Sequence, residues 1–345
     1  MVNKRTYWAV EALGVAAEGL GGTISNAQYV PGVQSVGITT NFNLEQIFQL
    51  GQLEIYQDLE EVPDVEVSVE RVIDQFTCMY ARTMNVGAPG NKITISGDQN
   101  NKCDVVFSVN NETTDDVAGD DNPDSYVWCS GMFCSSASFT FGVDGNFTES
   151  TTLVGNHKKW TAAPGAKIQN LPTDAAVLAG NAPTAGDVKK RQHFTMLSIP
   201  APISALAASE KAIQSISVSV DFGREEINAL GTRLPYHRFV TFPVEVSCEI
   251  EALVTDVTDM TMNALPNAAN TTAQAIKFVV GDIAVTDVQT IGASTAVHTF
   301  DLGAKNRVQS VTWNGVDTGG GNASITYSFR NFNKLDYTSA GTLNT

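Results

Sequence analysis

The chain has 345 residues, of which 17% are charged and 43% hydrophobic, and its formal net charge is −16. This length suits about two domains of ordinary size, and the composition excludes disorder over most of the chain. The acidic balance excludes a protein that holds nucleic acid by its phosphates, because that requires clustered lysine and arginine, but it leaves open a surface past which DNA slides.

The N-terminal segment carries Glu11 and Glu18 and has no unbroken apolar core, so we do not expect a signal peptide. No apolar run in the chain approaches the roughly 20 residues that a membrane-spanning helix needs. We therefore expect no membrane partner.

A repeat dominates the rest of the chain. Residues 33–63 align without a gap with residues 213–243 at an offset of 180, and nine of the 31 aligned positions are identical. Omission of Asp64 then places the identical segments 65–68 and 244–247 together. The repeat predicts two copies of one domain, joined head to tail.

Each copy contains one helical pattern, over residues 43–50 and 223–230. In the first copy Leu44, Ile47, Phe48 and Leu50 follow helical spacing. Gly51, and Gly231 in the second copy, stand where a left-handed residue would end a helix. We predict positive φ at both glycines and burial of Ile47, Leu50, Ile227 and Leu230.

Most other segments alternate between apolar and polar residues, which is typical of strands with one buried face. Clusters of Asn, Asp and Gly separate these segments, as turns require. The expected strands include residues 65–69, 105–109, 138–141, 216–220, 244–251, 276–280 and 324–329. We expect an all-β-dominated chain with minor α content.

The boundaries follow from the repeat and from composition. Residues 161–192 are rich in Ala, Gly and Pro and lack periodicity, which is typical of a linker. We predict a first domain over 1–160 and a second over 193–345. The residues that should form the repeated structural core are Phe42, Ile47, Leu50, Gly51, Pro63, Phe222, Ile227, Leu230, Gly231 and Pro243.

Motifs that carry chemistry are not found in the sequence. The four histidines are scattered, and no nucleophile elbow, phosphate-binding loop or dinucleotide fingerprint occurs. Cys129 and Cys134 could form half of a metal site, but free buried thiols explain them better, and an odd total of five cysteines favours a reducing compartment. The acidic segment 115–124 lacks the ligand spacing of a calcium loop. We expect no catalytic residue, cofactor or metal.

The module resembles the tail tube proteins of tailed bacteriophages. The resemblance rests on residues 222–250, on residues 138–156 and, less completely, on residues 42–68. It implies antiparallel β-sandwich or half-barrel domains, each with one short flanking helix. Six such modules form a ring in that family, and rings stack into a tube through which the genome passes. Two modules in one chain then imply a ring of three chains.

The resemblance also implies the partners. The chain would bind copies of itself as homotrimeric rings, and it would contact the tape measure, the terminator and, in a contractile tail, the sheath. Phage DNA would pass without specific binding. The protein would assemble in the host bacterial cytoplasm and reside in the virion tail.

Two alternatives remain open. One is another phage part, such as a tail completion ring, a baseplate ring or a capsid decoration protein. The other is a carbohydrate-binding β-sandwich pair in which Trp128, Trp160 and Trp313 stack on sugars. Polymer length distinguishes the first alternative from a tube protein, and glycan binding distinguishes the second.

Overall fold

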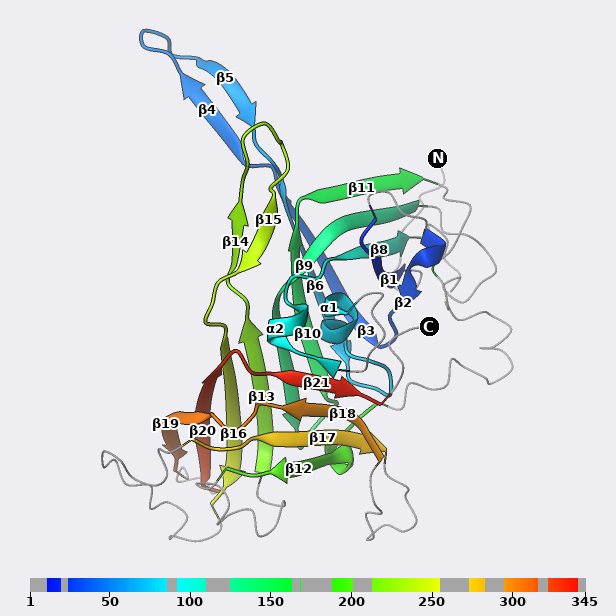
Figure 1. The fold of residues 1–345 in the computed structure, drawn as a ribbon, viewed down its shortest axis with the longest axis vertical. Coiled ribbons are helices and arrows are strands. Elements are labelled where there is room, and N and C mark those ends of the chain that lie inside the picture. The colour runs from blue at the N-terminus through cyan, green and yellow to red at the C-terminus, as the bar shows by residue number, and fades with distance from the viewer. Residues whose placement is uncertain are drawn as a thin grey trace.

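The computed structural model describes residues 11–19, 24–85, 92–109, 125–162, 168, 188–200, 213–254, 273–282, 295–315 and 322–340. These residues form an antiparallel, strand-dominated fold with two short α-helices, which confirms the expected all-β class (Figure 1). The helices are α1 (Met79–Met84) and α2 (Ile95–Asp98), and short 3-10 turns are η2 (Ile24–Asn26) and η4 (Arg191–His193).

The strands of the first half of the chain are β1 (Glu11–Ala17), β2 (Gln28–Tyr29), β3 (Val33–Asn41), β4 (Leu44–Phe48), β5 (Ile55–Glu60), β6 (Asp64–Val72), β7 (Lys92–Ile93), β8 (Cys103–Val109), β9 (Ser125–Gly142), β10 (Thr148–Gly155) and β11 (His157–Ala162). Those of the second half are β12 (Phe194–Ser198), β13 (Ile213–Asp221), β14 (Arg224–Ile227), β15 (His237–Val240), β16 (Glu245–Leu253), β17 (Lys277–Asp282), β18 (Thr295–Asp301), β19 (Arg307–Asn314), β20 (Ser324–Phe332) and β21 (Asp336–Ser339).

Eight strands of a 12-stranded sheet form a continuous path, called the central sheet here, in the order β3-β6-β10-β9-β13-β16-β20-β19. The other four strands join this sheet at the first half of β9, which pairs with β8 and β11, while β1 pairs with β8 and β2 with β1. The first four strands of the path come from one copy and the last four from the other, and each copy contributes its strands in the same order. In the sheet, β9 is the outermost strand of the first copy, and it pairs with β13, the outermost strand of the second copy on that side. The two copies therefore share one continuous sheet, and the predicted domain boundaries near 160 and 193 stay a prediction.

The structural repeat extends to irregularities in the ladders. The pairing of β3 with β6 shifts between Val33 and Ser35, and the pairing of β13 with β16 shifts at the aligned position between Ile213 and Ser215. A second shift lies in the pairing of β9 with β10, where Ser136 pairs with Thr152 but Cys134 pairs with Leu153. Its counterpart lies in the pairing of β19 with β20, where Ser310 pairs with Ser328 but Val308 pairs with Phe329. Bulges pin strand register, so the two four-stranded units can be equated residue by residue.

The ladders correct one detail of the sequence alignment. Asn41 pairs with Asp64 in the first copy, whereas Asp221 pairs with Glu245 in the second. Glu245 therefore occupies the position of Asp64, and Val65 matches Val246 instead of Val244. The sequence alignment was displaced by two residues, which leaves every side chain on the same face of the strand.

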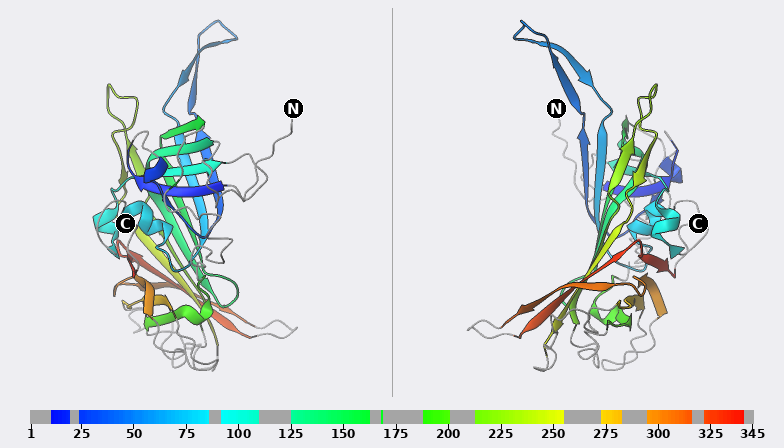
Figure 2. Two further views of the ribbon diagram at one scale, coloured as in Figure 1. Left: turned by 90° about the vertical axis from the view of Figure 1, so that its right-hand side faces the viewer. Right: turned by 60° about the vertical axis from the view of Figure 1, so that its left-hand side comes forward.

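One face of the central sheet is covered and the other is open (Figure 2). The covered face packs against α1 and against a second sheet with strand order β12-β17-β18-β21-β7. An aromatic cluster fills this interface, with ring centroids 4.9 Å apart for Phe139 and Phe300 and 5.1 Å apart for Phe141 and Phe278. One core cluster runs through both copies.

The predicted helices over 43–50 and 223–230 are wrong. Both segments belong to β-hairpins, β4–β5 and β14–β15, which project from the same end of the central sheet (Figure 1). Each hairpin begins after a residue with positive φ, Asn43 at 42° and Gly223 at 50°. The side chain of Asn41, and of Asp221 in the second copy, accepts the amide of that residue and closes the turn.

The glycine prediction is correct in conformation but wrong in context. Gly51 has φ 89° and Gly231 has φ 85°, yet both lie in hairpin turns. The helical spacing misled because the hairpins project into solvent. Their apolar residues are not sorted into a buried and an exposed face within this chain, so periodicity carried no information about secondary structure.

Candidate assembly surfaces

The central sheet ends at β3 on one side and at β19 on the other. Within the described part of the chain neither outer edge is paired with another strand. Such an edge presents unpaired backbone donors and acceptors, which makes it a template for another strand. Strand β3 has nine residues and β19 has eight, so both edges are long enough for a stable ladder.

The internal joint shows how such edges are completed. Seven residues of β13 pair with β9, from Ser215 opposite Gly142 to Asp221 opposite Ser136. On the covered face Phe139 stands opposite Val218, and both are fully buried. The joint therefore forms part of the core.

The equivalent side chains at the free edges are less buried: those of β19 are exposed and those of β3 are half-buried. Through the matched ladders Trp313 corresponds to Phe139 and Ile38 corresponds to Val218. Trp313 is 58% exposed, and Val311, which corresponds to the buried Ala137, is 37% exposed. Side chains that a strand partner buries at the joint therefore form an exposed apolar stripe along β19 and a half-buried one along β3.

The open face of the sheet carries hydroxyl and carboxylate groups. Serine and threonine dominate it, and Ser219 and Ser247 bond to each other across β13 and β16 at 2.6 Å. Its charged side chains are, from the ladder registers, seven carboxylates and two arginines: Asp64, Glu66, Glu70, Asp221, Glu245, Glu249, Glu251, Arg307 and Arg330. The face is therefore net acidic and holds few apolar groups.

The two hairpins form a third surface. Their large hydrophobic side chains are exposed, and the turn residues Leu50, Leu53 and Leu230 are as exposed as in an extended chain. The others are Leu44, Phe48, Ile55, Tyr56, Leu59, Ile227, Leu234, Tyr236 and Phe239. Exposed apolar area of this extent, held on ordered strands, marks an interaction site.

Most of the residues predicted to form a repeated structural core lie outside the hydrophobic core. Phe222 is fully buried, and Pro63 is partly buried. The predicted burial of Leu50, Ile227 and Leu230 is wrong, and Ile47 is only half-buried. The remaining members, Phe42, Gly51, Gly231 and Pro243, are exposed. Six of the ten positions lie within the projecting hairpins, and the other four flank them.

An ionic cluster supports the second hairpin at the internal joint. Arg238 of β15 forms an ion pair with Asp64 at the base of the first copy and another with Glu226 of β14, 2.5 Å away. It also donates to Asn156. These contacts hold the second hairpin beside the base of the first.

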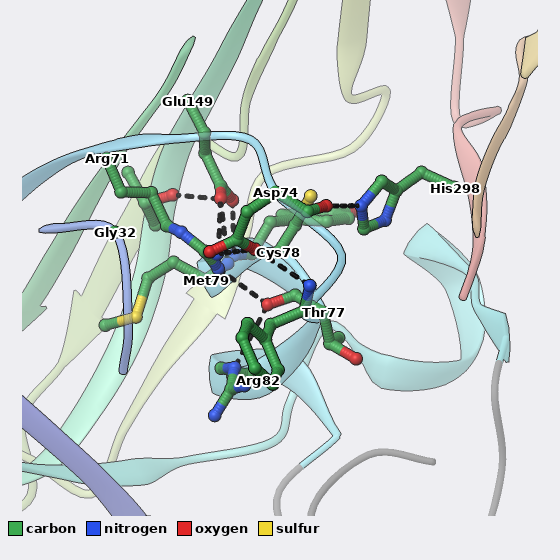
Figure 3. Close-up of polar contacts among 12 residues, drawn as sticks. Gly32, Arg71, Asp74, Thr77, Cys78, Met79, Arg82, Glu149 and His298 are labelled. Carbon is green, nitrogen blue, oxygen red and sulfur yellow. Dashed lines mark hydrogen bonds and ion pairs between the residues drawn. The ribbon is translucent and has the colours of Figure 1, made fainter. Parts of the chain in front are cut away.

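A buried polar cluster joins the central sheet to the second sheet (Figure 3). Arg71 of β6 forms a 2.8 Å ion pair with Asp74, and the Glu149 carboxylate accepts the amides of Met79 and Tyr80 at the start of α1. Burial raises the pKa values of Asp74 and Glu149, while Arg71 opposes both shifts. The cluster is inside the protein, so we interpret it as structural.

His298 of β18 completes this cluster. Its Nε2 lies 2.5 Å from the Asp74 carbonyl and its Nδ1 lies 2.7 Å from the Tyr337 hydroxyl. A carbonyl only accepts, so Nε2 carries the proton and Nδ1 accepts from the hydroxyl. Burial lowers the pKa of His298 to about 4, and the ring is neutral at physiological pH.

All five cysteines are buried and none forms a disulfide. Burial raises the pKa values of Cys134 and Cys248 to about 12. Cys129 and Cys134 lie on one strand, β9, and each is packed in the core. The acidic segment 115–124, and most of the predicted linker, lie outside the described residues.

The three tryptophans proposed as sugar platforms do not form one surface. Trp128 is buried and donates to Asp104 at 3.0 Å. Trp160 on β11 and Trp313 on β19 are exposed, but these strands lie at opposite ends of the molecule (Figure 1). The arrangement gives no support to a carbohydrate-binding site built from all three.

Comparison with known proteins identifies no relative: no protein-family model and no curated protein sequence matches the chain. Among the residues that the structure describes, no helix has the length and apolar character to cross a membrane.

Proposed function

We propose that this chain is a structural subunit that closes head to tail into a ring, and that rings stack into a tube of the kind found in bacteriophage tails. The observation that carries the proposal is the strand order β3-β6-β10-β9-β13-β16-β20-β19. In this spatial order, the last strand of copy one, β9, pairs with the first strand of copy two, β13. The same step, applied between chains, pairs β19 of one molecule with β3 of the next.

Repetition of one heterologous contact gives either a closed ring or an open filament. Three chains provide six modules, which is the number in the rings of the family that the sequence resembles. A ring also removes both exposed edges at once, and closure is the one arrangement that leaves none.

The open face of the sheet supports its assignment as the lumen. In a ring with the second sheet outside, this face lines the central channel. Its seven carboxylates outnumber its two arginines, so the face would repel the phosphates of passing DNA. An acidic lumen fits genome passage without specific binding.

The hairpins support axial contact between rings. Both project from one end of the sheet and carry apolar side chains that nothing within the described chain covers. A neighbouring ring would bury them. We assign the tape measure, the terminator and, in a contractile tail, the sheath as further partners, and the virion tail, assembled in the host cytoplasm, as the location.

Sedimentation velocity and negative-stain microscopy of the purified full chain test the proposal. We expect threefold or pseudo-sixfold rings that stack as the protein concentration rises. A monodisperse monomer at high concentration would contradict it. Single rings that never stack would favour a completion ring, and specific retention on immobilised glycans by a monomer would favour the carbohydrate-binding alternative.

A further inference from the structure

The internal joint defines the geometry that any equivalent joint must follow. In the covered-face and open-face pairs of that joint, Phe139 stands opposite Val218 and Ser138 stands opposite Ser219. The ladders within each copy equate Ser138 with Thr312, because Ser138 pairs with Ser150 and Thr312 with Thr326 at the same distance from the matched bulges. Ser219 corresponds to Thr39 at the offset of 180.

We infer that β3 of a neighbouring chain pairs with β19 in one register, with Thr39 opposite Thr312, and that Asp58 of that neighbour forms an ion pair with Arg330. The inference rests on the proposed ring and adds the residues that its interface joins. The register also places Ile38 of the neighbour opposite Trp313 and Thr40 opposite Val311.

The face and exposure of the side chains on both strands support this register. Trp313 and Val311 point to the covered face and are 58% and 37% exposed. The facing side chains of β3, Ile38 and Thr40, are only half-buried in the single chain. A displacement by one residue would turn either stripe toward the acidic open face, so only even displacements compete.

Charge supports it independently. At the internal joint the hairpin supplies the cation, Arg238, which lies between Asp64 at the sheet base and Glu226 of its own hairpin. The first hairpin has Asp58 at the position of Arg238, so the charge on the hairpin is reversed. Glu245 replaces Asp64 at the base.

The first hairpin has no arginine equivalent to Arg238, but the base of the second copy provides one. Arg330 of β20 forms an ion pair with Glu245, and Arg330 is 39% exposed. The corresponding residue of the first copy is Val154. A single arginine would then lie between two carboxylates at both joints, contributed by the hairpin at one and by the base at the other.

Paired cysteines test the register. Thr39→Cys combined with Thr312→Cys places two thiols directly opposite each other, within the Cα separation that a disulfide spans. We expect oxidation of assembled protein to give covalent dimers and trimers on non-reducing gels, with each single variant as a control. The native cysteines are buried and should not compete.

A displaced pair provides the matched control. Thr39→Cys with Ser310→Cys lies on the same face but two residues away, where the separation of about 7–8 Å is too long for a disulfide. Preferential cross-linking of this pair would overturn the register. Rings that form without cross-linking the first pair would also overturn it, while leaving the proposed ring intact. Failure of the unmodified protein to form rings would instead reject the proposed function.

Charge reversal tests the ion pair. We expect Asp58→Arg and Arg330→Asp each to raise the concentration for half-maximal ring assembly by about tenfold, and the double variant to recover most of that loss, as coupled charges do. Glu45→Arg, on the same hairpin, is the control and should change assembly less. A double variant no better than the sum of the singles would reject the Asp58–Arg330 pair.

Discussion

The joint between β9 and β13 and the free edges of β19 and β3 are built from corresponding strands in two different environments. Phe139 is fully buried at the joint, whereas Trp313 at the corresponding position is 58% exposed. Sequence repetition therefore does not reproduce burial. The exposed stripe has the composition of a core because, in our proposal, it becomes part of one when the neighbouring chain binds.

The largest expected difference between the two environments is in stability. Phe139→Ala removes a buried ring and should lower the free energy of unfolding by about 3–5 kcal/mol. Trp313→Ala should change it in the monomer by less than about 0.5 kcal/mol but abolish ring assembly. Denaturant titration of each variant, together with sedimentation, measures both effects. Equal losses of monomer stability in the two variants would contradict the difference in burial between Phe139 and Trp313.

The buried His298 should make the stability of the covered interior depend on pH, an effect that the exposed edges do not share. Its pKa is about 4 in the folded protein and about 6.5 when unfolded, so the unfolded state takes up the proton first. Stability should therefore fall by roughly 3 kcal/mol as pH drops from 6.5 to 4.

His298→Gln should remove this part of the pH dependence. Asp74 and Glu149 act in the opposite direction, because their raised pKa values favour the protonated fold as pH falls. The difference between the variant and the unmodified chain isolates the histidine. Parallel stability curves, measured by denaturant titration across this pH range, would contradict the assignment.

The hairpin turns offer a smaller test, away from both joints. Gly51→Ala and Gly231→Ala place a Cβ at φ 89° and 85°, which costs about 1 kcal/mol even though no atom lies within 4 Å of the added group. Hydrogen exchange of the hairpin amides should accelerate about fivefold in each variant. Gly19→Ala, at an ordinary φ, is the control. Unchanged exchange in both hairpins would show that the turns tolerate the substitution.

The smallest expected effect concerns the ionic cluster of the internal joint. Arg238 is mostly buried, but Asp64 is about half exposed, so water screens the pair. A double-mutant cycle with Arg238→Gln and Asp64→Asn should give a coupling energy of about 0.5–1 kcal/mol. A coupling energy near zero would show that the ion pair between Arg238 and Asp64 does not stabilise the internal joint.

Repetition, alternation and glycine placement are local signals, and they predicted the duplication, the strand-dominated class and the positive φ of Gly51 and Gly231. The sequence failed at residues 43–50 and 223–230, since a hairpin that projects from the body shows no periodic burial within its own chain. The identical letters at 65–68 and 244–247 also suggested an alignment that the ladders displace by two residues. The correct alignment is visible only in the folded protein, because register is set by pairing between strands far apart in sequence. For the same reason, only the folded sheet shows that β9 meets β13 and leaves β3 and β19 as matching edges.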